Sequence, residues 1–427
     1  MAPRVLLLLP TTTYRTTAFV AAARHLDVAL TVASELPSTF EQAQPEALLT
    51  LDLADPERAA ERAAEFARSH PIHAVVGVDD DTAVAAAAIA ERLGLRGNPV
   101  PAALAARDKN RQRQALALAG VPVPRFVLHR IDADPAILAR DVPYPCVLKP
   151  LRLSASRGVI RADDARAFIA AFGRLRAILS EPAVARCGEP ARHILVEEFI
   201  PGPEVALEGL LTDGRLHVLA LFDKPDPLDG PFFEETLYVT PSRLPEPAQR
   251  ALAATAQAAA AALGLIEGPV HAELRVNERG TWLIELAARP IGGRCSAALR
   301  FEARDEGRGE RDGSLEELIL RHALGMELPS LRREARASGV MMIPVPGRGT
   351  LQEVRGVDEA RAVPLVEDVV ITAYRGELLV PLPEGARYPG FIFARGEKPE
   401  LVETALREAH RRLSFVLAPS RGDRQAL

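Results

Sequence analysis

The chain has 427 residues, of which 52 are Lys or Arg and 57 are Asp or Glu, which leaves a formal net charge of −5. The 48% hydrophobic and 26% charged fractions are those of a folded globular protein, and this length allows two to four domains. The mildly acidic balance argues against a nucleic-acid-binding protein, which would show a basic face. No apolar run reaches the roughly 18 residues that a membrane span needs.

The chain contains few cysteines and few lysines. Three cysteines lie far apart without a CxxC pair, which predicts a reducing, cytoplasmic location without disulfides or a zinc knuckle. Only four residues are lysine, and the remaining basic residues are arginine. A compact ammonium is retained in such a chain mainly by chance or where a guanidinium cannot replace it. The four lysines are Lys109, Lys149, Lys224 and Lys398.

Residues 1–105 alternate between strand and helix patterns, which predicts a three-layer α/β domain with a parallel sheet. Strands are predicted at 4–9, 28–33 and 73–78, and helices at 16–25, 56–69 and 82–93. Asp79, Asp80 and Asp81 stand between the last strand and its helix, where carboxylates cap free amide groups. The alternative is contact with a substrate amine.

Patterns in the rest of the chain predict three further units, and the predicted fold class is therefore α/β and α+β multidomain. Residues 106–190 hold a linker helix, short strands and a helix at 163–178, and residues 191–330 hold mostly antiparallel strands. These strands are predicted at 193–199, 203–212, 215–222, 268–276 and 281–287, with helices at 246–263 and 314–324. The charged, Gly-rich segment 302–313 predicts a mobile surface loop. A C-terminal lobe with short strands and a helix at 399–413 occupies residues 331–427.

Two lysines and a loop of small residues suggest a binding site for a polyphosphate. Lys149 ends a predicted strand and Lys109 lies in the first turn of a helix, so their point charges could neutralise phosphate oxygens. The loop at 153–159 contains serines and a glycine that let backbone amides approach phosphates closely. Two surface lysines and an ordinary polar turn are the alternative.

Residues 196–204 form a strand end and a Pro-Gly-Pro turn with carboxylates on both sides. The backbone around Phe199 and Ile200 could present a donor and an acceptor to an adenine edge. Glu204 could accept hydrogen bonds from two ribose hydroxyls. A simple acidic strand end fits the same residues.

Glu273 and Glu285 lie on two strands joined by a short turn, and Arg289 follows the second. Paired carboxylates repel, and Mg²⁺ relieves that repulsion because it prefers oxygen ligands and bridges protein carboxylates to nucleotide phosphates. Arg289 would then face the negative charge that develops during phosphoryl transfer. Two exposed glutamates without a metal are the alternative. His271 is predicted to be a core residue or a neighbour of the site, and Cys295 has no base nearby in sequence.

The order of these motifs resembles the ATP-grasp superfamily over essentially the whole chain. The resemblance is greatest to the carboxylate–amine ligases, in particular the L-amino-acid (dipeptide) ligases, on the segments 294–301 and 314–318 and the extra C-terminal lobe. It implies an ATP-grasp fold that is preceded by a Rossmann-like pre-ATP-grasp domain.

The resemblance also implies roles for individual residues. Lys109 and Lys149 would bind ATP phosphates beneath a closing loop, Lys224 falls where such ligases often carry a basic residue, and Lys149 and Arg289 would be catalytic. The other implied positions are Ser154, Ser156 and Gly158 in the loop; Glu197, Glu198, Phe199 and Ile200 at the adenine; Glu204 at the ribose; and Glu273 and Glu285 as ligands of Mg²⁺ or Mn²⁺. Ala287 departs from the family, which often has Asn there, and this puts a third protein ligand in doubt.

The activity implied is an ATP- and magnesium-dependent ligase that joins a carboxylate, expected to be an amino acid, to an amine through an acyl phosphate. The products would be an amide or dipeptide, ADP and phosphate. Two alternatives stay open, namely a bicarbonate-using carboxylase of the purine or biotin type and a non-catalytic ATP-binding protein. The expected partners are small molecules, without nucleic acid or membrane, and a homodimer is the default for an oligomer.

Overall fold

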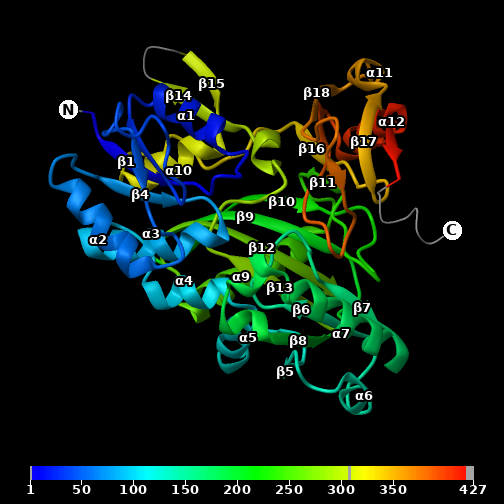
Figure 1. Cartoon of the computed structure of the whole chain (residues 1–427). Coiled ribbons are helices and arrows are strands. Elements are labelled where there is room, and N and C mark those ends of the chain that lie inside the picture. The colour runs from blue at the N-terminus through cyan, green and yellow to red at the C-terminus, as the bar shows by residue number, and fades with distance from the viewer. Residues whose placement is uncertain (1, 306–308, 420–427) are drawn as a thin grey trace.

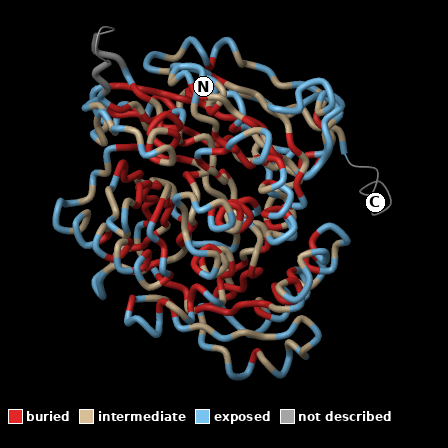
Figure 2. Tube along the Cα trace, turned by 90° about the vertical axis from the view of Figure 1, so that its left-hand side faces the viewer, coloured by how far each residue is buried: buried red, intermediate tan, exposed pale blue. Residues whose placement is uncertain are grey.

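The computed structural model describes residues 2–305 and 309–419, whose strands form five sheets. The N-terminal domain lies to one side of a large central sheet, and a small subdomain and the C-terminal lobe lie on its other sides (Figure 1). Buried residues gather in the interior around the sheets, and exposed residues lie at the periphery (Figure 2). No helix within the described residues is long and apolar enough to cross a membrane.

The N-terminal domain has the parallel sheet that its sequence predicted. The strands β1 (Arg4–Leu8), β2 (Ala29–Ser34), β3 (Leu48–Thr50) and β4 (Ala74–Gly77) pair in the order β3-β2-β1-β4. Alternate residues of β1 face opposite layers: Leu7 joins the core with α1 (Thr16–His25), while Leu6 joins the core with α2 (Pro56–Ala67) and α3 (Asp80–Leu93). A parallel sheet with both faces buried explains why β1 is apolar throughout.

Two helices connect this domain to the next. The helix α4 (Val100–Arg107) was not predicted from the sequence, although Pro101 lies in its first turn, where proline is favoured. The helix α5 (Lys109–Leu118) begins where predicted, since the side chain of Asp108 accepts hydrogen bonds from the amides of Asn110 and Arg111.

The small subdomain is a four-stranded antiparallel sheet covered by α7 (Ala165–Leu179). Its order is β5 (Phe126–Arg130), β8 (His193–Glu198), β6 (Cys146–Pro150) and β7 (Ile160–Ala162). The strand β8 therefore belongs here, because it pairs with β5 and β6, although the predicted partition at residue 191 assigned it to the large subdomain. The short helices α6 (Pro135–Leu138) and α8 (Pro182–Ala185) complete this unit.

The central sheet has eight strands in the order β13-β12-β9-β10-β11-β16-β20-β18. Their bounds are β9 (Glu204–Thr212), β10 (Arg215–Asp223), β11 (Leu237–Thr240), β12 (Gly268–Asn277), β13 (Gly280–Ala287), β16 (Ala337–Met342), β18 (Val366–Ile371) and β20 (Gly390–Gly396). Three strands of the C-terminal lobe thus extend the sheet of the large subdomain. The helix α9 (Glu246–Leu263) covers one face, where Leu207 is buried, and the opposite face, which carries Ala206, packs against the N-terminal domain.

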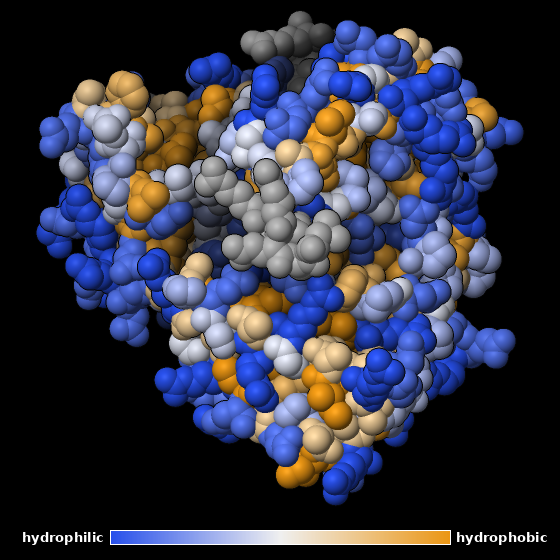
Figure 3. Space-filling model, turned by 45° about the vertical axis from the view of Figure 1, so that its right-hand side comes forward, coloured by the Kyte–Doolittle hydropathy of each residue, from blue (hydrophilic) through white to orange (hydrophobic). Residues whose placement is uncertain are grey.

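The remaining elements lie around this sheet. They are α10 (Leu315–Ala323), β17 (Gly349–Arg355), α11 (Val357–Arg361), β19 (Leu378–Leu379), α12 (Pro399–Arg412) and β21 (Ser414–Ala418), with short 3-10 turns at Glu189–Arg192 and Cys295–Ala298. On the face in Figure 3, hydrophilic side chains predominate and hydrophobic ones are scattered among them.

The prediction of a surface loop at 302–313 is wrong for its described residues. The strands β14 (Phe301–Asp305) and β15 (Gly309–Gly313) form an antiparallel pair, and residues 306–308 lie outside the described part. Composition misled the prediction because backbone pairing can hold a charged, Gly-containing hairpin without an apolar pattern.

Candidate active site

A cavity of about 760 Å³ lies where the N-terminal domain, both subdomains and the C-terminal lobe meet. The N-terminal domain contributes Thr12–Arg15, Asp79 and Asp80, and the C-terminal lobe contributes Met342 and Tyr388 among others. Most of the residues that were predicted as site residues also line it: Lys109, Lys149, Ser154, Ser156, Glu197, Glu198, Phe199, Ile200, Glu204, Glu273, Glu285 and Arg289. Gly158 and Lys224 do not.

The floor of the cavity is one face of the central sheet. In the antiparallel register Glu273 lies opposite Glu285 on β13 and opposite Ala206 on β9. The neighbouring pair along the same face is His271 with Glu208. Because side chains alternate along a strand, Glu204 of β9 and His271 and Glu273 of β12 lie on this face, and all three line the cavity. The hairpin thus brings the two predicted metal ligands side by side.

Each phosphate-binding candidate already contacts a carboxylate. Lys109 Nζ lies 2.8 Å from Glu285 Oε1 and donates to the backbone oxygen of Leu153 at 3.1 Å. Burial opposes the charged form of Lys109, but Glu285 outweighs it and raises the pKa of this lysine. Lys149 Nζ lies 2.8 Å from Glu197 Oε2. Both side chains are therefore held by carboxylates at the wall of the cavity.

Glu197 and its neighbours differ from the prediction of an open adenine site. The Glu197 carboxylate is buried and also accepts from Arg113 Nε at 2.7 Å. Burial acts to raise its pKa, but Arg113 and Lys149 together lower that pKa to about 2. The Phe199 amide donates to the backbone oxygen of Pro145, and the Ile200 oxygen accepts from Arg275. These two backbone groups are engaged, so adenine would need other groups of this segment.

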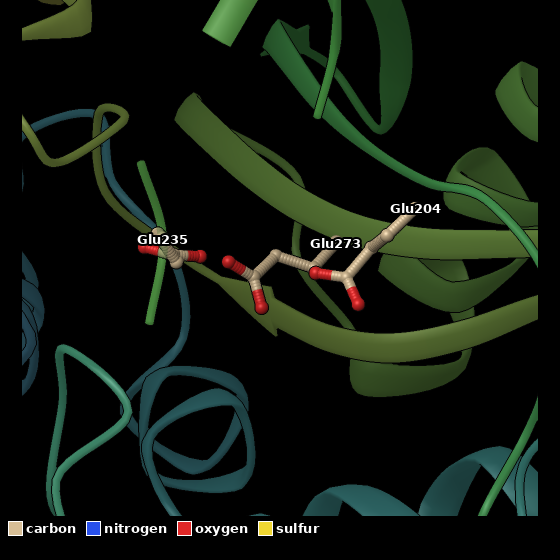
Figure 4. A group of neighbouring side chains, drawn as sticks. All are labelled: Glu204, Glu235 and Glu273. Carbon is tan, nitrogen blue, oxygen red and sulfur yellow. The ribbon is translucent and has the colours of Figure 1, made fainter. Parts of the chain in front are cut away.

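Lys224 is enclosed by three carboxylates and is not directed into the cavity. Its Nζ lies 2.7 Å from Glu204 Oε1, 2.6 Å from Glu235 Oε1 and 2.9 Å from Glu273 Oε1. Figure 4 shows the three glutamates in a row, with Glu273 between the other two. The second oxygen of Glu204 accepts from Arg275 at 2.8 Å, so both of its oxygens are occupied where a ribose contact was predicted.

Glu235 is the acidic residue that sequence analysis missed. It lies between β10 and β11, outside any regular pattern, and lines the cavity beside Tyr238, whose hydroxyl donates to it at 2.7 Å. Burial raises its pKa to about 7, with Lys224 opposing this shift and Glu273 adding to it. Ligand oxygens of Glu204, Glu235 and Glu273 lie within 4.8 Å of one another.

The donor set fits a hard divalent cation. Oxygens of Glu273 and Glu285 project from facing strands into the cavity, and two ammonium groups, on Lys224 and Lys109, now balance their charge. Carboxylate oxygens without thiolates or an imidazole cluster suit Mg²⁺ or Mn²⁺. Ala287 also lines the cavity and offers no ligand atom, as its sequence position indicated.

Arg289 links the sheet to the N-terminal domain. Its Nε lies 2.9 Å from Asp80 Oδ2. Burial acts to raise the pKa of Asp80, but Arg289 outweighs it and the pKa is lowered. Asp79 does occupy the N-cap of α3, where its amide donates to Thr82 Oγ1, so the capping prediction holds. Both aspartates nevertheless face the cavity, which the capping interpretation did not anticipate.

The small-residue loop after β6 is held from outside the subdomain. Ala155 and Ser156 have φ of 53° and 54°, a conformation in which successive backbone amides form an anion-binding concavity. The amide of Gly158 donates to the backbone oxygen of Pro383 at 2.9 Å, and Arg157 Nε donates to that of Glu384 at 2.8 Å. A segment of the C-terminal lobe thus fixes this loop.

Family models match three successive parts of the chain. They describe an ATP-grasp N-terminal domain at residues 20–97, an ATP-grasp domain at 142–298 and an L-amino acid ligase C-terminal domain 2 at 341–418. The chain has the fold of the ATP-grasp proteins, and it resembles the L-amino acid ligases, as its motifs indicated.

Individual relatives agree with this placement. The alanine–anticapsin ligase of Bacillus subtilis is 32% identical over 215 residues, or 47% of this chain and 45% of that protein. Carnosine synthase 1 of Gallus gallus is 30% identical over an alignment that covers 64% of this chain and 30% of the length of that protein. The chain spans about half the length of the first of these curated relatives. The crystal structure of L-amino acid ligase from Bacillus licheniformis is 28% identical, with a TM-score of 0.80 over 97% of this chain and 99% of that one.

Proposed function

We propose that this chain is an ATP- and magnesium-dependent ligase that joins the carboxylate of an amino acid to an amine through an acyl phosphate. The activities for which its relatives are named support the reaction type, since these relatives include an alanine–anticapsin ligase, D-alanine–D-alanine ligases and an L-amino acid ligase. The observation that carries the proposal is the gathering of Lys109, Lys149, the Glu273–Glu285 pair and Arg289 around one cavity.

Each of these groups has a part in phosphoryl transfer. Lys109 and Lys149 would hold the phosphates of ATP as point charges, and the amides of Ala155 and Ser156 would bind phosphate oxygens. Arg289 would stabilise the charge that develops as a carboxylate oxygen attacks the γ-phosphate. Glu273 and Glu285 would hold Mg²⁺, which when bound supplies charge neutralisation on the phosphates.

The charge of the cavity floor favours an amino acid as the carboxylate substrate. Glu204, Glu235 and Glu273 surround one ammonium, that of Lys224, so carboxylates are in excess there even with the pair to Arg275. Glu235 and Tyr238 line the cavity and could accept the α-ammonium of a substrate. We further propose a cytoplasmic location, where ATP is available and the three free thiols stay reduced, and a homodimer as the expected oligomer.

The test is phosphate release from ATP and Mg²⁺ with pairwise mixtures of amino acids, with bicarbonate as a separate arm. Release that depends on two amino acids, and formation of the matching dipeptide, is expected. Lys149→Ala should abolish release, whereas Lys398→Ala, an exposed lysine far along the chain, should not change it. Turnover that survives Lys149→Ala, or depends on bicarbonate alone, would contradict the proposal.

A further inference from the structure

Two adjacent aspartates lie at the end of the cavity that the N-terminal domain builds. In the strand order β3-β2-β1-β4, the direction of winding changes between β1 and β4. Ligands of open parallel sheets bind beyond the carboxyl ends of the strands at this point. The residues that follow β1 and β4 are Thr12–Arg15 and Asp79–Asp80, and all of them line the cavity. Arg289 reaches the same place from the other side and contacts Asp80.

We propose that Asp79 is the general base that accepts a proton from the ammonium of the second substrate, so that the free amine can attack the acyl phosphate. The proposal rests on the ligase function above and adds the residue that makes the attacking group nucleophilic. An ammonium has no lone pair, so an enzyme that joins an amino acid through its amine must remove this proton.

The two aspartates have opposite environments. Asp80 forms a short ion pair with Arg289, which keeps it ionised and makes it a weak base. For Asp79, burial outweighs the attraction of Arg15 and Arg289 and raises the pKa, and Asp80 and Asp81 add to the rise. Two neighbouring carboxyl groups whose pKa values are driven apart by their surroundings are typical of a division between a charged, positioning group and a proton acceptor.

The polar groups around Asp79 include one that is buried without a hydrogen-bond partner. Arg15 is 3% exposed, and its Nη2 donates to the backbone oxygens of Pro290 and Ile291 at 3.1 and 2.7 Å. Its Nε has no hydrogen-bond partner among the described residues and lies 3.9 Å from Asp79 Oδ1, beyond hydrogen-bond distance. Buried polar atoms are nearly always paired, so the unpaired Nε leaves a donor at the cavity wall that a small shift of Arg15 could offer to a polar ligand. An amino acid brings an ammonium for Asp79 and oxygens for Arg15.

The step balances in protons and electrons. A proton of the substrate ammonium passes to Asp79 Oδ as the nitrogen lone pair forms the bond to the acyl carbon. The nitrogen then loses its second proton as the bond between this carbon and the phosphate oxygen breaks, and phosphate leaves with the electron pair and that proton, as HPO₄²⁻. Asp79 then returns the proton to solvent through the mouth of the cavity.

The three aspartates offer a matched series: Asp79→Asn, Asp80→Asn and Asp81→Asn. Asparagine caps helices as well as aspartate, so Asp79→Asn should preserve the start of α3. Asp81 pairs with Arg107, outside the cavity lining, and serves as the control. Each variant is assayed with two nucleophiles, the amino acid and hydroxylamine, which is already unprotonated at neutral pH and traps the acyl phosphate as a hydroxamate.

Asp79→Asn is expected to lower amide formation by about 100-fold or more and to leave hydroxamate formation within about threefold of wild type. Amide formation by the wild type should fall as pH decreases through the raised pKa of Asp79, and this dependence should vanish in the residual activity of the variant. Equal loss of both products, or unchanged amide formation, would overturn the assignment. A wild type that forms no ATP-dependent hydroxamate with any amino acid would instead remove the ligase function.

Discussion

The two ends of the cavity differ in how completely their charged side chains are paired. At the end formed by the small subdomain and the hairpin, Lys109 pairs with Glu285, and Lys149 and Arg113 pair with Glu197. At the end formed by the N-terminal domain, Arg15 and Asp79 stand 3.9 Å apart, and a buried donor of Arg15 is unpaired among the described residues. The first end has its charged groups paired in advance, as suits a ligand of fixed chemistry such as the ATP that we propose. The second leaves polar groups for a substrate to satisfy.

Removing Arg289, which follows β13 and contacts Asp80 of the N-terminal domain, should have the largest effect. Arg289→Met is expected to lower ADP formation by about 10³-fold, because it removes a guanidinium that lines the cavity beside Asp80, while the nearby Lys109 is already paired with Glu285. Hydroxamate formation should fall as much as amide formation, since the loss precedes the acyl phosphate. Arg300→Met is the control, because Arg300 pairs with Glu367 outside the cavity lining. A variant at Arg289 that keeps full ADP formation would contradict its role.

The ion pairs of Glu197 should also make the stability of the fold depend on pH in the acid range. The pKa of Glu197 is lowered from 4.5 to about 2 in the folded chain, so its ion pairs stabilise the fold above the unfolded pKa. This stabilisation, of about 3 kcal/mol, is lost as pH falls from 4.5 towards 2. Urea unfolding between pH 6 and 3 measures it. Glu197→Gln should be destabilised at pH 6 and show a weaker acid dependence than Glu198→Gln; equal dependence would contradict the buried pair.

Asp80 tests the connection between the two ends. Asp80→Asn removes the charge that holds Arg289 and should lower kcat by about 10- to 100-fold, for hydroxamate and amide alike. This common loss distinguishes a positioning residue from the base at Asp79, whose loss affects the amide alone. If Asp80→Asn left hydroxamate formation at the wild-type rate, Arg289 would be held by other contacts.

The smallest effect is expected at the contact between the C-terminal lobe and the phosphate loop. Arg174 Nη2 donates to Glu384 Oε2 at 2.9 Å, and the backbone oxygen of Glu384 accepts from Arg157. Glu384→Gln weakens the first contact and keeps the second, so KM for ATP should rise severalfold with little change in kcat. Glu353→Gln, whose partner Arg355 lies elsewhere in the lobe and outside the cavity lining, should leave KM unchanged. A fall in kcat without a change in KM would contradict a role in holding the loop.

Local patterns predicted most of the fold. The apolar strands and capped helices of the N-terminal domain and the β12–β13 hairpin lie within a few residues of their predicted bounds, because short-range periodicity and turn chemistry determine them. The membership of β8 and the extension of the central sheet by β16, β20 and β18 depend on long-range pairing, which local patterns do not encode.

The same distinction between local patterns and long-range contacts applies to the candidate site. Glu273, Glu285 and Lys149 were predicted because they lie at fixed positions on strands. Glu235 was missed because it lies in an irregular segment, and its place in the site depends on the turn between β10 and β11. The enclosure of Lys224 by three carboxylates depends on side chains from separate strands, so its sequence position suggested only a basic residue near the nucleotide.

The central claim is that a substrate carboxylate takes the γ-phosphate of ATP before an amine attacks. The most direct measurement uses an amino acid labelled with ¹⁸O in its carboxylate and analyses the released phosphate by mass spectrometry. The account predicts one ¹⁸O atom in each phosphate, formed together with ADP and the amide. Phosphate that carries oxygen from water instead, or release of AMP and pyrophosphate, would contradict it.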